Sequence, residues 1–131
     1  MTEMETPLAR VRGLGSAHHG GQEWWEVRLN SVALLGLSIW LLVSLVRLPD
    51  LSQVTVVEWL RQPLAAVPML LLIVTVFWHA KHGLREVIDD YAHDEGWRTF
   101  WLMLLSFACW IGGAFAAFFV LKMALSVGGA G

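Results

Sequence analysis

The sequence predicts an all-α membrane protein with three transmembrane helices, and three observations lead to this fold class. The chain has 131 residues, of which 56% are hydrophobic and 15% charged, a composition too apolar for a soluble domain of this size. Three apolar runs cover residues 29–46, 64–78 and 100–121, and charged residues follow or flank each of them. A helix needs about twenty residues to cross roughly 30 Å of hydrocarbon, so each run predicts one span.

The first transmembrane helix is predicted over residues 29–47. Residues 1–28 precede it as a polar segment without the apolar core of a signal peptide, so we expect this segment to be retained. The segment ends near Trp24, Trp25 and Arg28, whose side chains suit the headgroup layer of a membrane. We therefore expect these residues to anchor the entry into the bilayer.

The second transmembrane helix is predicted over residues 63–90. Before it, residues 48–62 form an outer loop, because Pro49 disfavours a helical conformation in the residue that precedes it. Within this loop residues 54–60 favour a short interfacial helix, and Pro63 suits the first turn of the second span. A helix of this length extends about 42 Å, so its last turns must leave the hydrocarbon.

The third transmembrane helix is predicted over residues 98–122, after a polar turn at residues 92–98. Small residues recur in it at the four-residue spacing that lets helix backbones approach closely in lipid. The pairs are Gly112 with Ala116 and Gly113 with Ala117. The chain thus divides into an N-terminal segment (1–28), a three-helix anchor domain (29–125) and a short C-terminal tail (126–131).

The distribution of basic residues predicts the orientation of the chain. One side of the predicted membrane carries Arg10, Arg12, Arg28, Lys81, Arg85 and Arg98, and the other carries Arg47, Arg61 and Lys122. The positive-inside rule then places the N-terminus in the cytoplasm and the C-terminus outside.

Net charge, cysteine content and histidine spacing argue against a nucleic-acid partner, an intrachain disulfide and a metal site at His18 and His19. A formal net charge of −2 argues against a nucleic-acid partner. The single cysteine, Cys109, lies inside the third apolar run and has no partner for an intrachain disulfide. His18 and His19 have no further cysteine or histidine at ligand spacing, so we interpret them as part of a loop and not as a metal site.

The most informative segment runs from His79 to Tyr91, where titratable side chains follow an apolar run. Ionisable residues at membrane depth are costly, so they usually face a partner, a cofactor or a water path. On a helix with 3.6 residues per turn, His79, His82, Glu86 and Asp90 fall on one face. That face predicts a site inside a helix bundle.

His79 has two interpretations. It can be an axial ligand to haem iron, as in other helical bundles that hold this cofactor, or a histidine hydrogen-bonded to a neighbouring helix or to headgroups. A six-coordinate haem needs a second ligand on the opposite face of the ring. His82 lies on the same face of the same helix, and the other histidines lie outside the spans. The haem hypothesis therefore requires a ligand from another polypeptide.

Cations near His79 are candidates for pairing with haem propionates, because positive charges neutralise carboxylates near the interface. The candidates are Arg28, Lys81, His82 and Arg85. Each can equally be a snorkelling or surface charge.

Tyr91 and Asp90 predict a second site at the membrane edge. The phenol of Tyr91, the only tyrosine, can donate and accept a hydrogen bond, and the neighbouring carboxylate can orient it or relay protons. This pair suits a quinone carbonyl, whose reduction takes up electrons and protons. The alternative is an interfacial aromatic anchor beside a solvated acid.

The chain resembles the smaller hydrophobic membrane-anchor subunit, a cytochrome b, of succinate dehydrogenase (succinate:quinone oxidoreductase, complex II). Members carry a pattern of the type His-Ala-x-x-Gly-x-x-x-Val-Ile/Leu-x-Asp-Tyr in the second helix. The residues that match are His79, Ala80, Gly83, Val87, Ile88, Asp90 and Tyr91. Before the first helix, Gly15-Ser16-Ala17, Gly20, Trp24-Trp25 and Arg28 also match, whereas Gln22-Glu23 stand where relatives often have a histidine.

The resemblance implies roles for individual residues. His79 would be the haem b axial ligand, that is, the ligand of the haem iron, opposite a histidine of the larger anchor. Tyr91 would hydrogen-bond a ubiquinone carbonyl with support from Asp90, and Arg28 would lie near the haem propionates. Flavin and iron–sulphur clusters would belong only to partner subunits.

The resemblance also implies partners, location and activity. The partners would be the larger cytochrome b anchor, the iron–sulphur subunit, the flavoprotein subunit and membrane lipid, in a heteromeric helix bundle of a bacterial inner (plasma) membrane. The chain would pass electrons from succinate oxidation, in the tricarboxylic acid cycle, to ubiquinone and the respiratory chain, without itself oxidising succinate. The alternatives are a fumarate reductase-type anchor, a small proton-relay or transporter subunit, and a haem-only electron carrier.

Overall fold

The computed structural model describes residues 6–11 and 20–126, and the regular secondary structure in these ranges is entirely helical. The helices are α1 (Pro7–Val11), α2 (Gly20–Arg47), α3 (Gln53–Leu60), α4 (Pro63–Tyr91) and α5 (Glu95–Ala124). Three of them, α2, α4 and α5, contain segments that are long and apolar enough to cross a membrane. The predicted all-α fold with three transmembrane helices is therefore confirmed.

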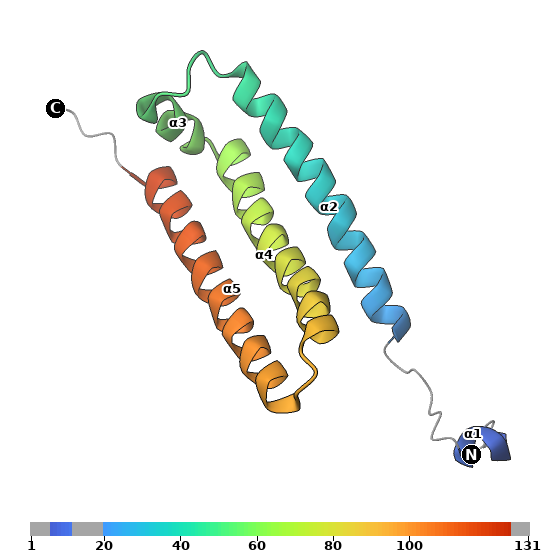
Figure 1. The fold of residues 1–131 in the computed structure, drawn as a ribbon. Coiled ribbons are helices and arrows are strands. Elements are labelled where there is room, and N and C mark those ends of the chain that lie inside the picture. Colours follow the sequence, from blue (N-terminus) through green and yellow to red (C-terminus); the bar gives the residue numbers. More distant parts are fainter. Residues whose placement is uncertain (1–5, 12–19, 127–131) are drawn as a thin grey trace.

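The three long helices lie in a row with α4 in the middle (Figure 1). Helices α2 and α5 each pack against α4, and α3 contacts α4 and α5 at the end of the molecule where α2 finishes. The start of α2, the end of α4 and the start of α5 share the opposite end. Because α4 packs against α2 on one side and against α5 on the other, its side chains take part in both helix contacts.

Helix α2 begins at Gly20, about nine residues earlier than the sequence predicts. The prediction used the onset of the apolar run, but a helix that extends beyond the hydrocarbon can continue with polar residues if they support one another at four-residue spacing. Gln22 donates a hydrogen bond to Glu26 (3.1 Å), and the guanidinium of Arg28 lies 4.1 Å from the ring centroid of Trp24. The Trp pair therefore belongs to the helix and not to a polar segment before it.

The loop between α2 and α4 contains the predicted short helix, α3, which is confirmed with a start at Gln53. Ser52 is its N-cap, since its hydroxyl accepts a hydrogen bond from the backbone N–H of Thr55. Hydrogen bonds from Ser52 and Thr55 lower the pKa of Asp50 to about 2. The carboxylate of Asp50 therefore stays ionised at neutral pH, and its support of this turn is lost only as the pH falls toward 2.

Helices α4 and α5 are joined by a turn shorter than predicted. Pro63 occupies the first turn of α4, as expected, and the helix ends at Tyr91. Helix α5 begins at Glu95, three residues before the predicted start, with Asp94 as its N-cap residue. Acidic residues are favourable in the first turn of a helix because they face its positive dipole end, so the polar stretch begins the helix instead of preceding it.

The contact between α4 and α5 depends on two adjacent glycines. The ring of Phe77 on α4 lies against Gly112 and Gly113 on α5. A Cβ atom at Gly112 would come within 2.8 Å of Cε1 of Phe77, whereas one at Gly113 would lie 3.5 Å from the nearest ring atom. The small-residue pattern of the sequence therefore serves helix packing, as predicted.

These distances predict different effects on stability for alanine substitutions at the two glycines. Gly112→Ala forces the Phe77 ring to move, and we expect overpacking to destabilise the chain by about 1 kcal/mol or more. Gly113→Ala adds an ordinary contact and removes a flexible residue from a helix, so we expect a neutral or slightly stabilising effect. Thermal dissociation of the purified membrane complex measures both. Equal midpoints for the two variants would contradict the tight contact at Gly112.

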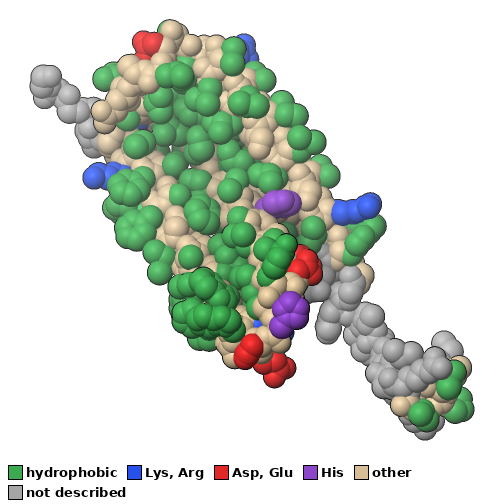
Figure 2. Space-filling view, in the orientation of Figure 1, with side chains coloured by type: hydrophobic (Ala, Val, Ile, Leu, Met, Phe, Trp, Pro, Cys, Tyr) green, Lys and Arg blue, Asp and Glu red, His purple; other side chains and the backbone are tan. Residues whose placement is uncertain are grey.

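Most large apolar side chains remain exposed on the isolated chain. Buried residues in the described part are few, namely Leu60, Ala65, Ala66 and Leu72. Hydrophobic side chains cover most of the face shown in Figure 2, and the charged side chains visible there lie toward its ends and edges. Helices that are apolar on all sides are typical of membrane spans. The chain is accordingly a multi-pass membrane protein.

Candidate functional site

His79 lies at the contact between α4 and α2. Its Nδ1 atom is 3.5 Å from the side-chain nitrogen of Asn30, which also lies 3.5 Å from the backbone oxygen of Thr75. These contacts are partly buried and span helices that are far apart in sequence. The sequence placed His79 on an inward face but did not identify Asn30 as its neighbour. A polar amide inside an apolar run was the available signal.

His82, one turn further along α4, is held by its own helix. Its Nδ1 lies 2.9 Å from the backbone oxygen of Trp78, and the two rings have centroids 3.8 Å apart. No hydrogen bond joins any two of His79, His82, Glu86 and Asp90 in the described residues. All four residues lie in α4, with His79 and His82 half-buried and Glu86 and Asp90 exposed, and they do not form a connected hydrogen-bonded chain.

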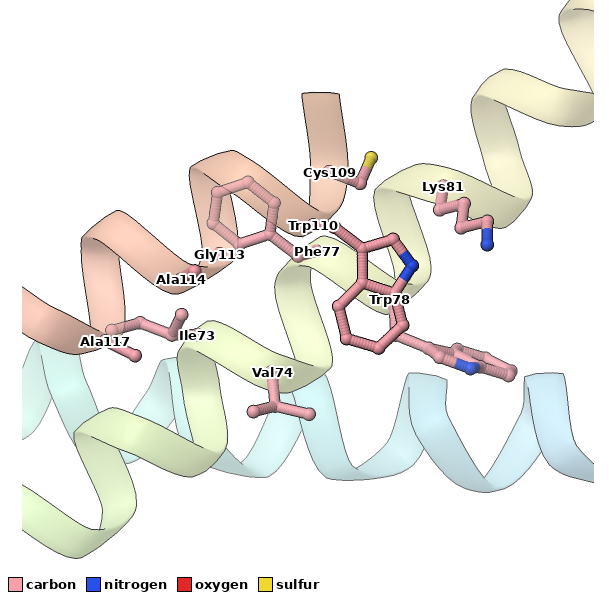
Figure 3. Close-up of a pocket in the computed structure, with 10 residues that line it drawn as sticks. All are labelled: Ile73, Val74, Phe77, Trp78, Lys81, Cys109, Trp110, Gly113, Ala114 and Ala117. Carbon is pink, nitrogen blue, oxygen red and sulfur yellow. The ribbon is translucent and has the colours of Figure 1, made fainter. Parts of the chain in front are cut away.

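The predicted cationic residues lie in different surroundings. Arg28 stacks on Trp24 of α2, close in sequence to Asn30. Lys81 lines an apolar groove of about 330 Å³ between α4 and α5. Figure 3 shows Lys81 among the residues of this groove, together with Phe77 and small residues of α5. Since His79 faces α2, Lys81 belongs to the other flank of α4.

A charged cluster joins the ends of α4 and α5, and the sequence analysis missed it. Arg98 donates a hydrogen bond from Nε to the carboxylate of Asp89 (2.6 Å), and Arg85 approaches the other oxygen of that carboxylate at 3.7 Å. The available signal was a pair of opposite charges on either side of a short turn between two antiparallel helices. This ion pair connects α4 and α5 across the turn that follows Tyr91.

Tyr91 and Asp90 lie at the end of α4 and are both exposed. The side chain of Tyr91 is accessible over a large fraction of its surface, since the residue is 80% exposed. No hydrogen bond between the Asp90 carboxylate and the Tyr91 phenol occurs in the described structure. The backbone oxygen of Tyr91 lies 3.1 Å from Nδ1 of His93. The phenol is thus free to meet a molecule that arrives from outside this chain.

The donor set around His79 fits a haem ligand. Nδ1 faces the amide of Asn30, and within the described part of the chain Nε2 has no hydrogen-bond partner. A metal-binding histidine usually donates its other N–H to an acceptor, and the side-chain oxygen of Asn30 can supply that acceptor after a half-turn of the amide. No cluster of three or more metal-binding side chains exists among the described residues. Haem iron requires only one or two protein ligands, so this set suffices for it.

His18 and His19, interpreted above as part of a loop, and the motif residues Gly15-Ser16-Ala17 lie outside the described residues. The motif residues from Trp24 onward all lie in described helices. Along α4, His79 and Tyr91 are separated by about 18 Å of helical rise. The structure therefore places the two predicted sites on one helix, one beside α2 and one at its end.

Comparison with known proteins agrees with the motif. Residues 2–124 match the family described as succinate dehydrogenase/fumarate reductase transmembrane subunit. The chain is 34% identical to the succinate dehydrogenase hydrophobic membrane anchor subunit of Paracoccus denitrificans over 66% of this chain and 67% of that protein. The subunit of the same name from Rickettsia bellii is 29% identical over 68% and 71% of the two chains.

A third relative of the same name, from Rickettsia conorii, is 24% identical over 82% of this chain and 86% of its own length. No solved structure matches the chain. The family match covers almost the whole sequence and includes all three spans. The resemblance inferred from the motif is confirmed: the chain belongs to the succinate dehydrogenase/fumarate reductase transmembrane subunit family, as an anchor subunit of the succinate dehydrogenase type.

Proposed function

We propose that the chain anchors a succinate:ubiquinone oxidoreductase in the membrane, supplies one axial histidine to haem b and forms part of the site where ubiquinone is reduced. The observation that carries this proposal is the position of His79, an imidazole held by α2 through one nitrogen and open at the other. Family membership supports the assignment to succinate dehydrogenase. The larger cytochrome b anchor, the iron–sulphur subunit and the flavoprotein subunit are the proposed partners.

In this proposal His79 would hold the haem iron through Nε2, and the larger anchor would supply the other protein ligand. Bound haem b supplies a one-electron redox centre. Arg28 is the candidate that the family resemblance implies for pairing with a propionate, and in the structure its guanidinium stacks on Trp24. His82 has its other nitrogen available for a similar contact. Lys81 and Arg85 are weaker candidates, since Lys81 faces the α5 flank and Arg85 approaches Asp89.

The quinone site in this proposal lies at the end of α4. Tyr91 donates a hydrogen bond from its phenol to a ubiquinone carbonyl, and Asp90 supports proton uptake from the aqueous side. Full reduction of the quinone consumes two electrons and two protons. Exposure of Tyr91 on the isolated chain supports this role, because the partners must complete the pocket around it.

The proposed location is a bacterial inner membrane with the N-terminus in the cytoplasm. The basic residues near the start of α2 and the turn between α4 and α5 gather at one end of the molecule, which supports this orientation. The N-terminal segment 1–28, anchor domain 29–125 and tail 126–131 remain the proposed division of the chain. Structurally, the helical part of the anchor extends back to Gly20.

A fumarate reductase-type anchor has the same architecture and differs in the direction of electron flow. Relatives named as succinate dehydrogenase subunits favour the oxidative direction. A proton-relay or transporter subunit would use the polar face of α4 as a continuous path. The hydrogen bonds of His79 and His82 go to α2 and to the backbone of α4, so the geometry gives this alternative no specific support.

Purification of the native complex through a tag on this chain tests the proposed function. We expect mass spectrometry to identify a flavoprotein, an iron–sulphur protein and a second membrane subunit, and the visible spectrum to show haem b. The complex should reduce ubiquinone with succinate. A preparation that lacks both flavin and haem would contradict the proposal and favour a transporter subunit.

A further inference from the structure

Asn30 is a partly buried polar residue of α2, and it faces α4 at His79. Its side-chain nitrogen lies 3.5 Å from Nδ1 of His79 and 3.5 Å from the backbone oxygen of Thr75, at the outer limit of hydrogen-bond length. An amide inside an apolar segment costs free energy unless it is hydrogen-bonded. The contacts of Asn30 with α4 must therefore satisfy the amide, and His79 provides the side chain among them.

The neighbouring polar side chains of α2 have other partners. The hydroxyl of Ser31 donates to the backbone oxygen of Val27 (2.8 Å), and Arg28 stacks on Trp24. Thr75, on α4, uses its hydroxyl on the backbone oxygen of Leu71. In the described structure, Asn30 alone connects a polar side chain of α2 to the imidazole.

The chemistry of the imidazole determines which atom Asn30 must present. A neutral histidine carries one N–H and one lone pair, and a nitrogen that binds a metal must be the one with the lone pair. If Nε2 binds iron, Nδ1 carries the hydrogen and needs an acceptor. If an amide N–H donates to Nδ1 instead, the hydrogen moves to Nε2 and blocks it.

The side-chain oxygen and nitrogen of asparagine exchange places by a half-turn of the amide, so Asn30 can present either atom to the imidazole. The structure has the nitrogen toward Nδ1, where it also donates to the backbone oxygen of Thr75, and the exchanged orientation gives up this second hydrogen bond. With its oxygen toward Nδ1 the amide accepts the hydrogen of the imidazole. The orientation of one amide thus selects the nitrogen of His79 that is available to a ligand.

Building on the proposed role of His79, we propose that Asn30 is a positioning residue: its side-chain oxygen accepts a hydrogen bond from Nδ1–H of His79 and keeps Nε2 unprotonated toward the haem iron. A hydrogen bond of this kind fixes the plane of the ring and increases the basicity of the ligating nitrogen. Helix α2 therefore takes part in haem binding although its own residues do not ligate the iron.

The test uses the intact complex with Asn30→Leu, Asn30→Ala and Asn30→Asp, and Ser31→Ala as the matched control. Removing the acceptor weakens electron donation by the imidazole, so Asn30→Leu and Asn30→Ala should raise the haem midpoint potential and broaden the low-spin electron paramagnetic resonance signal. Asn30→Asp retains an acceptor and should leave the potential unchanged or lower it. Ser31→Ala should match the wild-type protein in both measurements.

Two outcomes overturn the inference. The first is a wild-type potential and resonance signal in Asn30→Leu and Asn30→Ala. The second is a shift of the same sign and size in Asn30→Asp and in the apolar variants. Asn30→Ala adds no bulk at the α2–α4 contact, so it decides the question if the Asn30→Leu complex does not assemble.

The variant His79→Leu separates this inference from the proposed function. A His79→Leu complex that retains the six-coordinate haem spectrum would overturn the proposed ligand, whatever the Asn30 variants show. Loss of that spectrum in His79→Leu, together with unchanged Asn30 variants, would overturn only the positioning role of Asn30. Loss in His79→Leu and a raised potential in the apolar Asn30 variants would support both.

Discussion

Replacing His79 by leucine should abolish the six-coordinate low-spin spectrum of haem b in the purified complex. Leucine has no donor atom, and the described part of the chain offers no other histidine in the same position against α2. The iron then keeps only the ligand from the partner subunit, so we expect a five-coordinate spectrum or loss of the haem. Visible absorption and electron paramagnetic resonance of the reduced and oxidised complex measure the change.

His82→Leu is the matched control for this substitution. His82 lies one turn away on the same helix, and its imidazole contacts the backbone and ring of Trp78 instead of another helix. We expect His82→Leu to retain six-coordinate haem, with at most a shift in midpoint potential through a propionate contact. If His82→Leu lost the low-spin spectrum and His79→Leu kept it, the ligand assignment within α4 would be wrong.

The number of spans could be predicted because apolar length is a property of the sequence alone. The helix ends could not be located as well, since they depend on local contacts. Helix α2 extends back to Gly20 through pairs such as Gln22 with Glu26, which stabilise a helix outside the hydrocarbon. Hydropathy has no signal for such turns. The same holds for the start of α5 at Glu95, because hydropathy does not register that an acidic residue favours the first turn of a helix.

The candidate site could be predicted on one helix but not across two. The period of α4 places His79 on an inward face, yet only the packing of α2 shows that Asn30 lies opposite it. Likewise, the pairing of Asp89 with Arg98 depends on the turn that joins α4 to α5. Contacts between helices depend on crossing positions, which a single sequence does not specify.

The middle position of α4 explains how the sequence combines packing with chemistry. Phe77 faces α5 and fills the space left by Gly112 and Gly113, while His79, two residues later, faces α2. Residues two apart on a helix point in nearly opposite directions. The close approach of α5 therefore holds α4 from one flank while the other flank presents the imidazole. A substitution at Phe77 should therefore weaken the contact between α4 and α5 more than it changes the contact of His79 with α2.

Replacing Tyr91 by phenylalanine should lower succinate:ubiquinone reductase activity on the order of 10²-fold while succinate oxidation with a soluble dye acceptor stays at the wild-type level. The change removes one hydroxyl and keeps the aromatic ring, so a packing role would be preserved. Only the hydrogen bond to the quinone carbonyl, and the proton transfer it assists, are lost. The ratio of the two activities in one preparation is the measurement.

Trp97→Phe provides the control for this prediction, because Trp97 is another exposed aromatic residue at the same end of the α4–α5 pair, 60% exposed against 80% for Tyr91. An anchor at the headgroup layer tolerates exchange of one aromatic ring for another, so Trp97→Phe should retain the wild-type ratio. A similar ratio in Tyr91→Phe would mean that the phenol, too, is an interfacial anchor. If Tyr91→Phe lowered both activities, the phenol would be needed for assembly of the complex, because the dye receives electrons without passing through the quinone site. Selective loss of quinone reduction therefore assigns the hydroxyl of Tyr91 to the quinone.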